Sequence, residues 1–222
     1  MIVIVSPSKT QHIKLAPNEK YYQPYLMDHT AELIRLLRHM SRVELSHLMK
    51  ISPKLTDLTC ERLQDFTLPH TAGASGNALS TFQGDAFSAI DTDTYTAEDF
   101  LFAHTHLRIL SGLYGFLKPL DLMQPYRLEM GTKLVSDRGK NLYEFWGSLI
   151  TAALNAELET MNERVIVNCA SKEYSRVIKQ KLLVGTMITI TFKQMKNDTL
   201  KTIAIYAKRA RGMFVNFLIK NR

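Results

Sequence analysis

Three apolar segments of the chain end in polar and small residues whose types suit a phosphate-bearing ligand. The segments IVIV (2–5), RIL (108–110) and VIV (165–167) run into SPSKT (6–10), SGLYG (111–115) and NCASKEY (168–174). Hydroxyls, backbone N–H groups and lysine bind phosphate oxygens, and glycine lets backbone approach a ligand. Because ligands bind at the carboxyl ends of parallel strands in α/β sheets, we predict one polar pocket lined by Ser6, Lys9, Thr10, Ser111, Gly112, Gly115, Asn168 and Ser171.

A carboxylate beside this predicted pocket supports a second hypothesis, an enzyme acting on a nucleotide or nucleobase. Glu173 can serve as the acid/base group in N-glycosidic or related chemistry, with Lys172 and Lys9 as the other candidate catalytic residues. The hypothesis requires Glu173 to face the pocket. It fails if that side chain points into solvent or only caps its own helix.

The segment HLRILSGLYGFLKPL (106–120) also fits a different structure. In a helix-hairpin-helix element, apolar helices flank a glycine-rich hairpin whose backbone N–H groups contact DNA phosphates. Here the glycines have the spacing Gly-x-x-Gly, whereas Gly-x-Gly is more usual. The two hypotheses differ in whether residues 107–111 form a strand or a helix.

Positive charge is concentrated in the last quarter of the chain. The formal net charge is +7, and residues 164–222 contain 13 Lys or Arg against two acids, a local balance of 13 − 2 = +11. A basic segment beside a mildly acidic remainder is typical of a protein that meets a polyanion on one face, although a solvated face without a partner gives the same pattern. Lys208, Arg209 and Arg211 form its densest cluster.

The histidines, the cysteines and the hydropathy of the chain bear on metal binding, on cofactors and on the location of the protein. His104 and His106 diverge on the helix predicted there, and Cys60 and Cys169 form no CxxC pair, so we expect no metal site and no cofactor. Two isolated cysteines, no signal peptide and no run of ~20 apolar residues indicate a cytoplasmic protein without a membrane partner. Asp121, Arg127 and Glu129 suit a structural ion pair as well as a catalytic set.

Hydrophobic periodicity and capping residues predict the elements that position these side chains, in an α/β fold (α+β in detail) with a mixed sheet flanked by helices. We predict strands at 1–5, 107–111 and 164–168, one helix or two meeting near Ser41 within 28–50, and further helices at 52–66, 96–106, 170–183 and 209–222. Two β-branched runs around Asn197 and Asp198 predict a hairpin over 186–208.

Six motifs, in order along the chain, resemble the YaaA family of bacterial peroxide-stress-response proteins: SPSKT, FQGDAF, LRILSGLYGFLKPLDLMQPYRLEMGT, KNLYEFWG, NCASKEY and YAKRARG. The resemblance implies a single compact α/β domain of unusual topology over residues 1–222 and a cytoplasmic location. It also implies a role in keeping unincorporated iron low during hydrogen peroxide stress, and DNA binding through a positively charged cleft with a helix-hairpin-helix-like element.

Matched positions of these motifs give the expected nucleic-acid interface: Lys9, Arg108, Tyr114, Arg127, Lys172, Lys208, Arg209 and Arg211. The lysines and arginines would neutralise phosphates, and Tyr114 would stack on a base or sugar. We expect a monomer that binds double-stranded or structured DNA and affects iron indirectly. The chain departs from the family pattern at Gln83, where relatives carry lysine, at Cys169, where leucine is usual, and in ending at Arg222, where relatives continue.

Overall fold

The computed structural model describes residues 1–16, 20–196 and 198–222. Its main sheet is built around β1 (Ile2–Val5), whose four residues are all buried. Within the described residues the strand order is β6-β5-β1-β8-β9, and β1 pairs in parallel with β5 (Leu107–Ser111) and β8 (Val165–Asn168). A strand with a parallel neighbour on each side is covered on both faces. This burial explains why β1 is apolar throughout.

The sheet is mixed, which confirms the predicted α/β class. At one edge β6 (Gly115–Leu117) pairs antiparallel with β5, and at the other β9 (Thr186–Thr189) pairs in parallel with β8. After β1 the chain next joins this sheet at β5, on one side of β1. After β8 it next joins the sheet at β9, on the opposite side. Opposite exits of this kind create a crevice between the carboxyl ends of two neighbouring strands. Here the crevice lies between β1 and β8.

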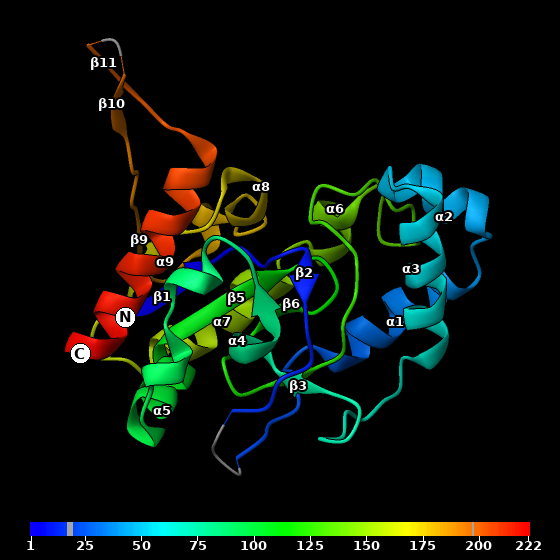
Figure 1. The fold of residues 1–222 in the computed structure, drawn as a ribbon, viewed down its shortest axis with the longest axis horizontal. Coiled ribbons are helices and arrows are strands. Elements are labelled where there is room, and N and C mark those ends of the chain that lie inside the picture. Colours follow the sequence, from blue (N-terminus) through cyan, green and yellow to red (C-terminus); the bar gives the residue numbers. More distant parts are fainter. Residues whose placement is uncertain (17–19, 197) are drawn as a thin grey trace.

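Helices at one end of the molecule come from the first third of the chain: α1 (Met27–Arg38), α2 (Arg42–Met49) and α3 (Pro53–Asp65) (Figure 1). The alternative of two helices meeting near Ser41 is confirmed. Ser41 accepts a hydrogen bond from the Glu44 backbone N–H, and Glu44 accepts one from the Ser41 backbone N–H. This capping box fixes the start of α2.

The remaining elements cover the sheet and extend the chain. The helices are α4 (Ala78–Thr81), α5 (Ala97–His106), α6 (Leu142–Trp146), α7 (Leu149–Glu159), α8 (Lys172–Ser175) and α9 (Ala204–Asn221). Single-turn 3-10 helices are η1 (Phe87–Ala89), η2 (Thr92–Thr94) and η3 (Gln180–Leu182). Short antiparallel pairs join β2 (Thr10–Gln11) to β4 (Phe82–Gln83), and β3 (Gly76–Asn77) to β7 (Leu122–Met123). Figure 1 shows α9 and both chain termini at the end opposite α2 and α3.

Residues 107–117 form a β-hairpin, so the helix-hairpin-helix alternative is wrong for this segment. β5 and β6 pair antiparallel around Gly112 and Gly115, and Gly115 has φ +71. The buried Trp146 donates its indole N–H to the Gly112 carbonyl at 3.0 Å. Because all residues of both strands are buried, their backbone N–H groups are not available to DNA phosphates.

The helix predicted over 170–183 is wrong beyond its first turn. α8 ends at Ser175, and the chain then packs against α7 as a loop containing η3. Side chains of α7 bind this loop: the Thr151 hydroxyl accepts from Lys179 N–H, while Asn155 binds Leu182 O and Val184 N–H. These hydrogen bonds satisfy backbone groups that a longer helix would have paired internally.

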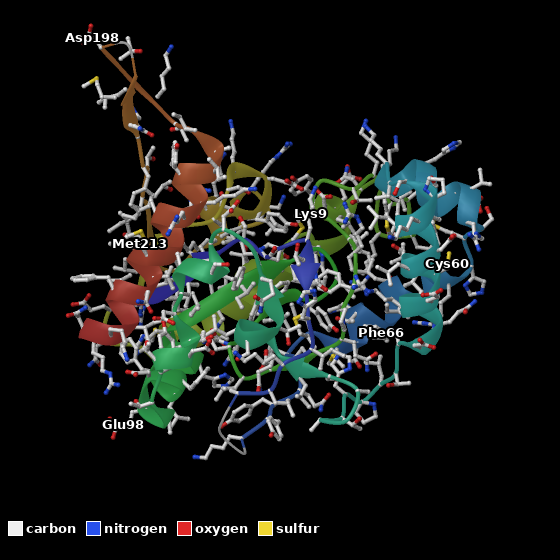
Figure 2. The ribbon with its side chains drawn as sticks, in the orientation of Figure 1. Lys9, Cys60, Phe66, Glu98, Asp198 and Met213 are labelled. Carbon is white, nitrogen blue, oxygen red and sulfur yellow. The ribbon has the colours of Figure 1, made fainter. Side chains whose placement is uncertain are left out.

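The hairpin predicted over 186–208 is shorter than expected. β9 joins the main sheet, and β10 (Gln194–Lys196) pairs with β11 (Thr199–Lys201). Asn197, one of the two predicted turn residues, lies outside the described residues. Figure 2 shows Asp198 at the outer end of this projecting hairpin. α9 then begins at Ala204, five residues before the predicted start.

Candidate functional site

A cavity of about 530 Å³ lies at the carboxyl ends of β1 and β8. Five parts of the chain form its walls: residues 5–11 after β1, 84–90 around η1, 126–129, 169–174 after β8, and one side of α9. Figure 2 marks Lys9, in the loop between β1 and β2. The crevice predicted from the strand ends is therefore a hollow in the structure, and α9 closes it on one side.

Two serines join the strand ends at the base of this cavity. The Ser6 hydroxyl accepts a hydrogen bond from the Ser171 backbone N–H at 2.8 Å and lies 3.2 Å from the Ser171 hydroxyl. Cys169 N–H also donates to the Ile4 carbonyl at 2.9 Å. These contacts hold the loops after β1 and β8 together.

Cations from three of the walls surround the cavity. Lys9 forms an ion pair with Glu129 at 2.7 Å, whereas Arg127 lies 3.9 Å from the same carboxylate oxygen. Lys208 and Arg211 enter the wall from α9 and form no ion pair within the described residues. The positive charge here is only partly compensated by carboxylates.

Glu173 lines the same cavity and is half-buried. Its Oε1 accepts a hydrogen bond from the Gly131 backbone N–H at 3.0 Å, and its backbone carbonyl accepts one from the Tyr143 hydroxyl at 2.9 Å. The carboxylate therefore neither points freely into solvent nor caps its own helix. The condition that would have excluded an acid/base role is absent.

Buried apolar and aromatic side chains also line the cavity: Phe87, Ile90, Tyr126, Leu128, Cys169 and Tyr174. The Tyr126 hydroxyl lies 2.6 Å from the Ser111 hydroxyl. Burial raises the pKa of the Cys169 thiol to about 11, and the nearby charge of Arg211 opposes this only in part. Cys169 is thus a protonated wall residue and not a reactive thiolate.

The structure brings together most of the pocket and interface residues that lie outside β5. The predicted residues that line the cavity are Ser6, Lys9, Thr10, Arg127, Ser171, Glu173, Lys208 and Arg211. Lys172 and Arg209 are exposed close by in sequence but do not belong to its walls. The site residues named from the sequence did not include residues 84–90. The motif FQGDAF, which covers residues 82–87, and Gly84, which has φ +106 directly after β4, were the available signals.

Arg108 and Tyr114 do not belong to an interface, and their predicted roles are corrected. The Arg108 side chain is only 2% exposed, pairs with Glu157 at 2.6 Å and donates to the backbone carbonyls of residues 104, 105 and 107. The Tyr114 ring is fully buried, and its hydroxyl lies 3.0 Å from His70 Nε2 and accepts from the Gln124 N–H. Neither side chain can reach a phosphate or a base.

The predicted pocket residues at the end of β5 are also structural. The Ser111 hydroxyl accepts from the Tyr114 N–H at 2.9 Å, and Gly112 packs against the backbone of Leu128. Gly115 packs against Trp146. Residues 126–128 cover this strand end, so a ligand has no access to it. Asn168, at the end of β8, is buried as well and accepts from the Ala170 N–H at 2.9 Å.

The two histidines of the His-x-His pair have separate partners, as the predicted helix required. His104 Nδ1 accepts from the Leu120 N–H and its ring stacks on Tyr22, while His106 Nδ1 lies 2.8 Å from the Met1 carbonyl. No group of three or more His, Cys, Asp or Glu has metal-site geometry within the described ranges. In the same part of the chain, no helix combines the length and apolar character needed to cross a bilayer.

Asp121 gives a prediction about pH. Its side chain is buried, at a distance from the Arg127–Glu129 ion pair. Burial raises the pKa of the Asp121 carboxyl from 3.8 to about 7. Between these values the unfolded chain ionises Asp121 while the folded chain keeps it protonated, so stability falls as pH rises, by at most about 1.4 kcal/mol per pH unit.

We therefore expect Asp121→Asn to lose less stability than the wild type between pH 4 and pH 7. Urea unfolding of both proteins across this range checks the prediction. Parallel stability curves would show that Asp121 ionises at its ordinary pKa.

The geometry defines a class of protein: an α/β protein with a cation-lined cavity at the switch point of a mainly parallel sheet. The chain belongs to the peroxide stress protein YaaA family, whose model matches residues 1–222. It is similar to UPF0246 protein AM1_4276 of Acaryochloris marina (strain MBIC 11017), with 53% identity over 222 residues, 100% of this chain and 87% of that relative. The family resemblance of the six motifs is thus confirmed.

Proposed function

We propose that this member of the peroxide stress family binds DNA through the basic face around the cavity and so limits iron-driven oxidative damage. The observation that carries the proposal is the placement of Lys208 and Arg211 of α9 on the same cavity as Lys9 and Arg127. Uncompensated cations at such spacing bind successive phosphates and release counterions.

The proposed effect on free iron is indirect. Cysteine thiolate is a strong protein ligand for iron, but Cys169 is buried with a raised pKa and Cys60 lies on a different element, α3. The protein would lower damage at the DNA rather than store the metal. Metal analysis of the purified protein tests this part, and one firmly bound iron per chain would overturn it.

The test of DNA binding is the double variant Lys208→Ala/Arg211→Ala. Each lost phosphate contact lowers the slope of log K against log salt by about 0.9, so we expect a decrease of about 1.8 and weaker binding to all sequences alike. Titrations of a labelled duplex at several salt concentrations measure both effects.

A matched control removes two exposed cations from α1 and α3, in the variant Arg35→Ala/Lys54→Ala. It has the same net charge as the first variant, but both positions lie outside the cavity walls. If the control lowers the slope as much, binding depends on total charge and the proposed face is wrong. An unchanged slope in Lys208→Ala/Arg211→Ala would also exclude this face.

A second function is favoured by one observation, the carboxylate of Glu173 in the cavity wall. In this hypothesis the protein hydrolyses the N-glycosidic bond of a bound nucleotide, and Glu173 acts as the acid/base group. Incubation with nucleotides and with oligonucleotides carrying damaged bases tests it by release of free base. No release above a Glu173→Gln control would exclude the enzyme.

A further inference from the structure

Two arginines of the cavity wall each have a buried nitrogen that has no hydrogen-bond partner among the described residues. These are Arg127 Nε and Arg211 Nε, and the two residues come from different walls, residues 126–129 and α9. A buried donor without an acceptor costs about 1–3 kcal/mol. Native proteins rarely leave such groups unpaired unless water, an ion or a ligand completes them. Both arginines line the same cavity, so one bound anion there can pair with both side chains.

The charge near Arg127 also calls for an anion. Its nearest carboxylate oxygen, on Glu129, lies 3.9 Å away and already pairs with Lys9 at 2.7 Å. Arg62 and Arg127 also line a second, smaller hollow together. The pKa of Arg62 is lowered by burial and by the positive charge of Arg127. Lys9 and Arg127 thus share one carboxylate, and the cavity walls as a whole carry four cations, Lys9, Arg127, Lys208 and Arg211, against the carboxylates of Asp85, Glu129 and Glu173. A phosphate monoester offsets this remaining positive charge and presents three acceptor oxygens.

The apolar part of the cavity indicates what the phosphate is attached to. Phe87, Ile90 and Tyr174 are buried wall residues, and inorganic phosphate gains nothing from such a surface. An aromatic heterocycle packs well against it, and the carboxylate of Glu173 lies in the same walls. The volume of about 530 Å³ is in the range of small-ligand sites and too small for a duplex.

We propose that this cavity binds a single nucleotide through its terminal phosphate, with Arg127 and Arg211 as the phosphate ligands and the base against the aromatic wall. The inference rests on the proposed function for its choice of a nucleotide over another aromatic phosphate ester. A free nucleoside monophosphate and the phosphorylated end of a DNA strand present the same chemistry.

The first test uses the wild-type chain and calorimetric titration with dAMP, deoxyadenosine and inorganic phosphate. Because charged hydrogen bonds are worth about 1.5–3 kcal/mol, we expect dAMP to bind at least about tenfold more tightly than deoxyadenosine. Inorganic phosphate should bind more weakly than dAMP because it lacks the base. A short single strand with a 5′-phosphate is then compared with the same strand carrying a 5′-hydroxyl.

The two comparisons, of dAMP with deoxyadenosine and of the phosphorylated strand with the unphosphorylated strand, identify the source of the phosphate. Preference for dAMP over deoxyadenosine indicates a free nucleotide, and preference for the phosphorylated strand indicates a strand end. Both results support the inference. If neither pair shows a preference for the phosphate, the proposed site is wrong.

The second test uses two arginines of α9 that are only two residues apart. Arg211→Met should weaken dAMP binding by about tenfold or more and leave deoxyadenosine binding unchanged. Arg209→Met is the matched control, because Arg209 is exposed and outside the cavity walls, and it should bind dAMP as the wild type does. Equal losses in both variants would overturn the assignment. Circular dichroism of both variants checks the fold, and Arg127→Met repeats the test from the opposite wall.

The outcomes separate this inference from the proposed function. If duplex binding responds to Lys208→Ala/Arg211→Ala but the phosphate preference is absent, only the nucleotide site is wrong. If dAMP binds with dependence on Arg211 while the duplex does not bind, the DNA proposal is wrong and the phosphate site remains.

Discussion

Replacing Arg108 with methionine is expected to lower the free energy of unfolding by about 3–5 kcal/mol, the usual cost of removing one partner of a buried ion pair. The Arg108 side chain is 2% exposed and pairs with Glu157 at 2.6 Å. Its guanidinium also donates to three backbone carbonyls at the end of α5 and the start of β5. Methionine fills a similar volume but leaves these acceptors unpaired. Urea unfolding followed by circular dichroism measures the loss.

Arg127→Met is the matched control for this prediction. Arg127 is also mostly buried, but it pairs weakly with Glu129 and lies near the like charge of Arg62. We expect its removal to change stability by less than about 1 kcal/mol. The double variant Arg108→Met/Glu157→Leu should recover little of the loss, because Glu157 also pairs with Lys118 at 2.7 Å and the three backbone carbonyls stay unpaired in both variants. If Arg108→Met is as stable as the wild type and binds DNA less well, Arg108 belongs to the interface after all.

The central strands and the position of the cavity were predictable from short sequence patterns. β1 and β8 are apolar runs that end abruptly in polar residues. A parallel strand buried on both faces, such as β1, requires such a run, whereas Val165 and Val167 of β8 are only half-buried. The structure places Ser6 and Ser171, which follow these strands, in direct contact. Their proposed role in binding remains a prediction, whereas their proximity is a feature of the fold.

The same reasoning gave the wrong environment for the end of β5. Nothing in the sequence shows that residues 126–128 cover this strand end, because the coverage depends on long-range packing of Gly112 against the Leu128 backbone. Arg108 was misassigned for a similar reason. Its partner Glu157 is 49 residues away on α7, and a buried arginine looks like an exposed one until that partner is known.

The start of α9 was missed because its first residues are β-branched or aromatic. Ile205 and Tyr206 favour a strand by intrinsic propensity, but packing of the helix overrides this preference. The buried face consists of Ala207, Gly212, Val215 and Ile219. Tyr206 and Met213 lie on the outer side of the helix and are 58% and 60% exposed. As a result Lys208 and Arg211 are positioned by a helix, not by a strand end.

At Gly212, α9 packs tightly against another part of the cavity wall. A Cβ atom at this position would lie within van der Waals overlap of the Ala86 carbonyl oxygen and 3.0 Å from the Ala89 Cβ. Both neighbours belong to the segment around η1, which forms another wall of the cavity. Gly212 therefore allows the two walls to pack directly on each other.

Gly212→Ala is expected to destabilise the protein by about 3 kcal/mol, the cost of overpacking a tight contact. The same substitution in an exposed helix stabilises by about 1 kcal/mol, so the expected sign is reversed. Displacement of α9 also moves Lys208 and Arg211, and dAMP and duplex binding should weaken together. Gly73→Ala, where a Cβ meets nothing within 4 Å, is the control and should change neither property. A Gly212→Ala protein that is more stable than the wild type and binds dAMP normally would show that this contact does not hold α9 against the cavity.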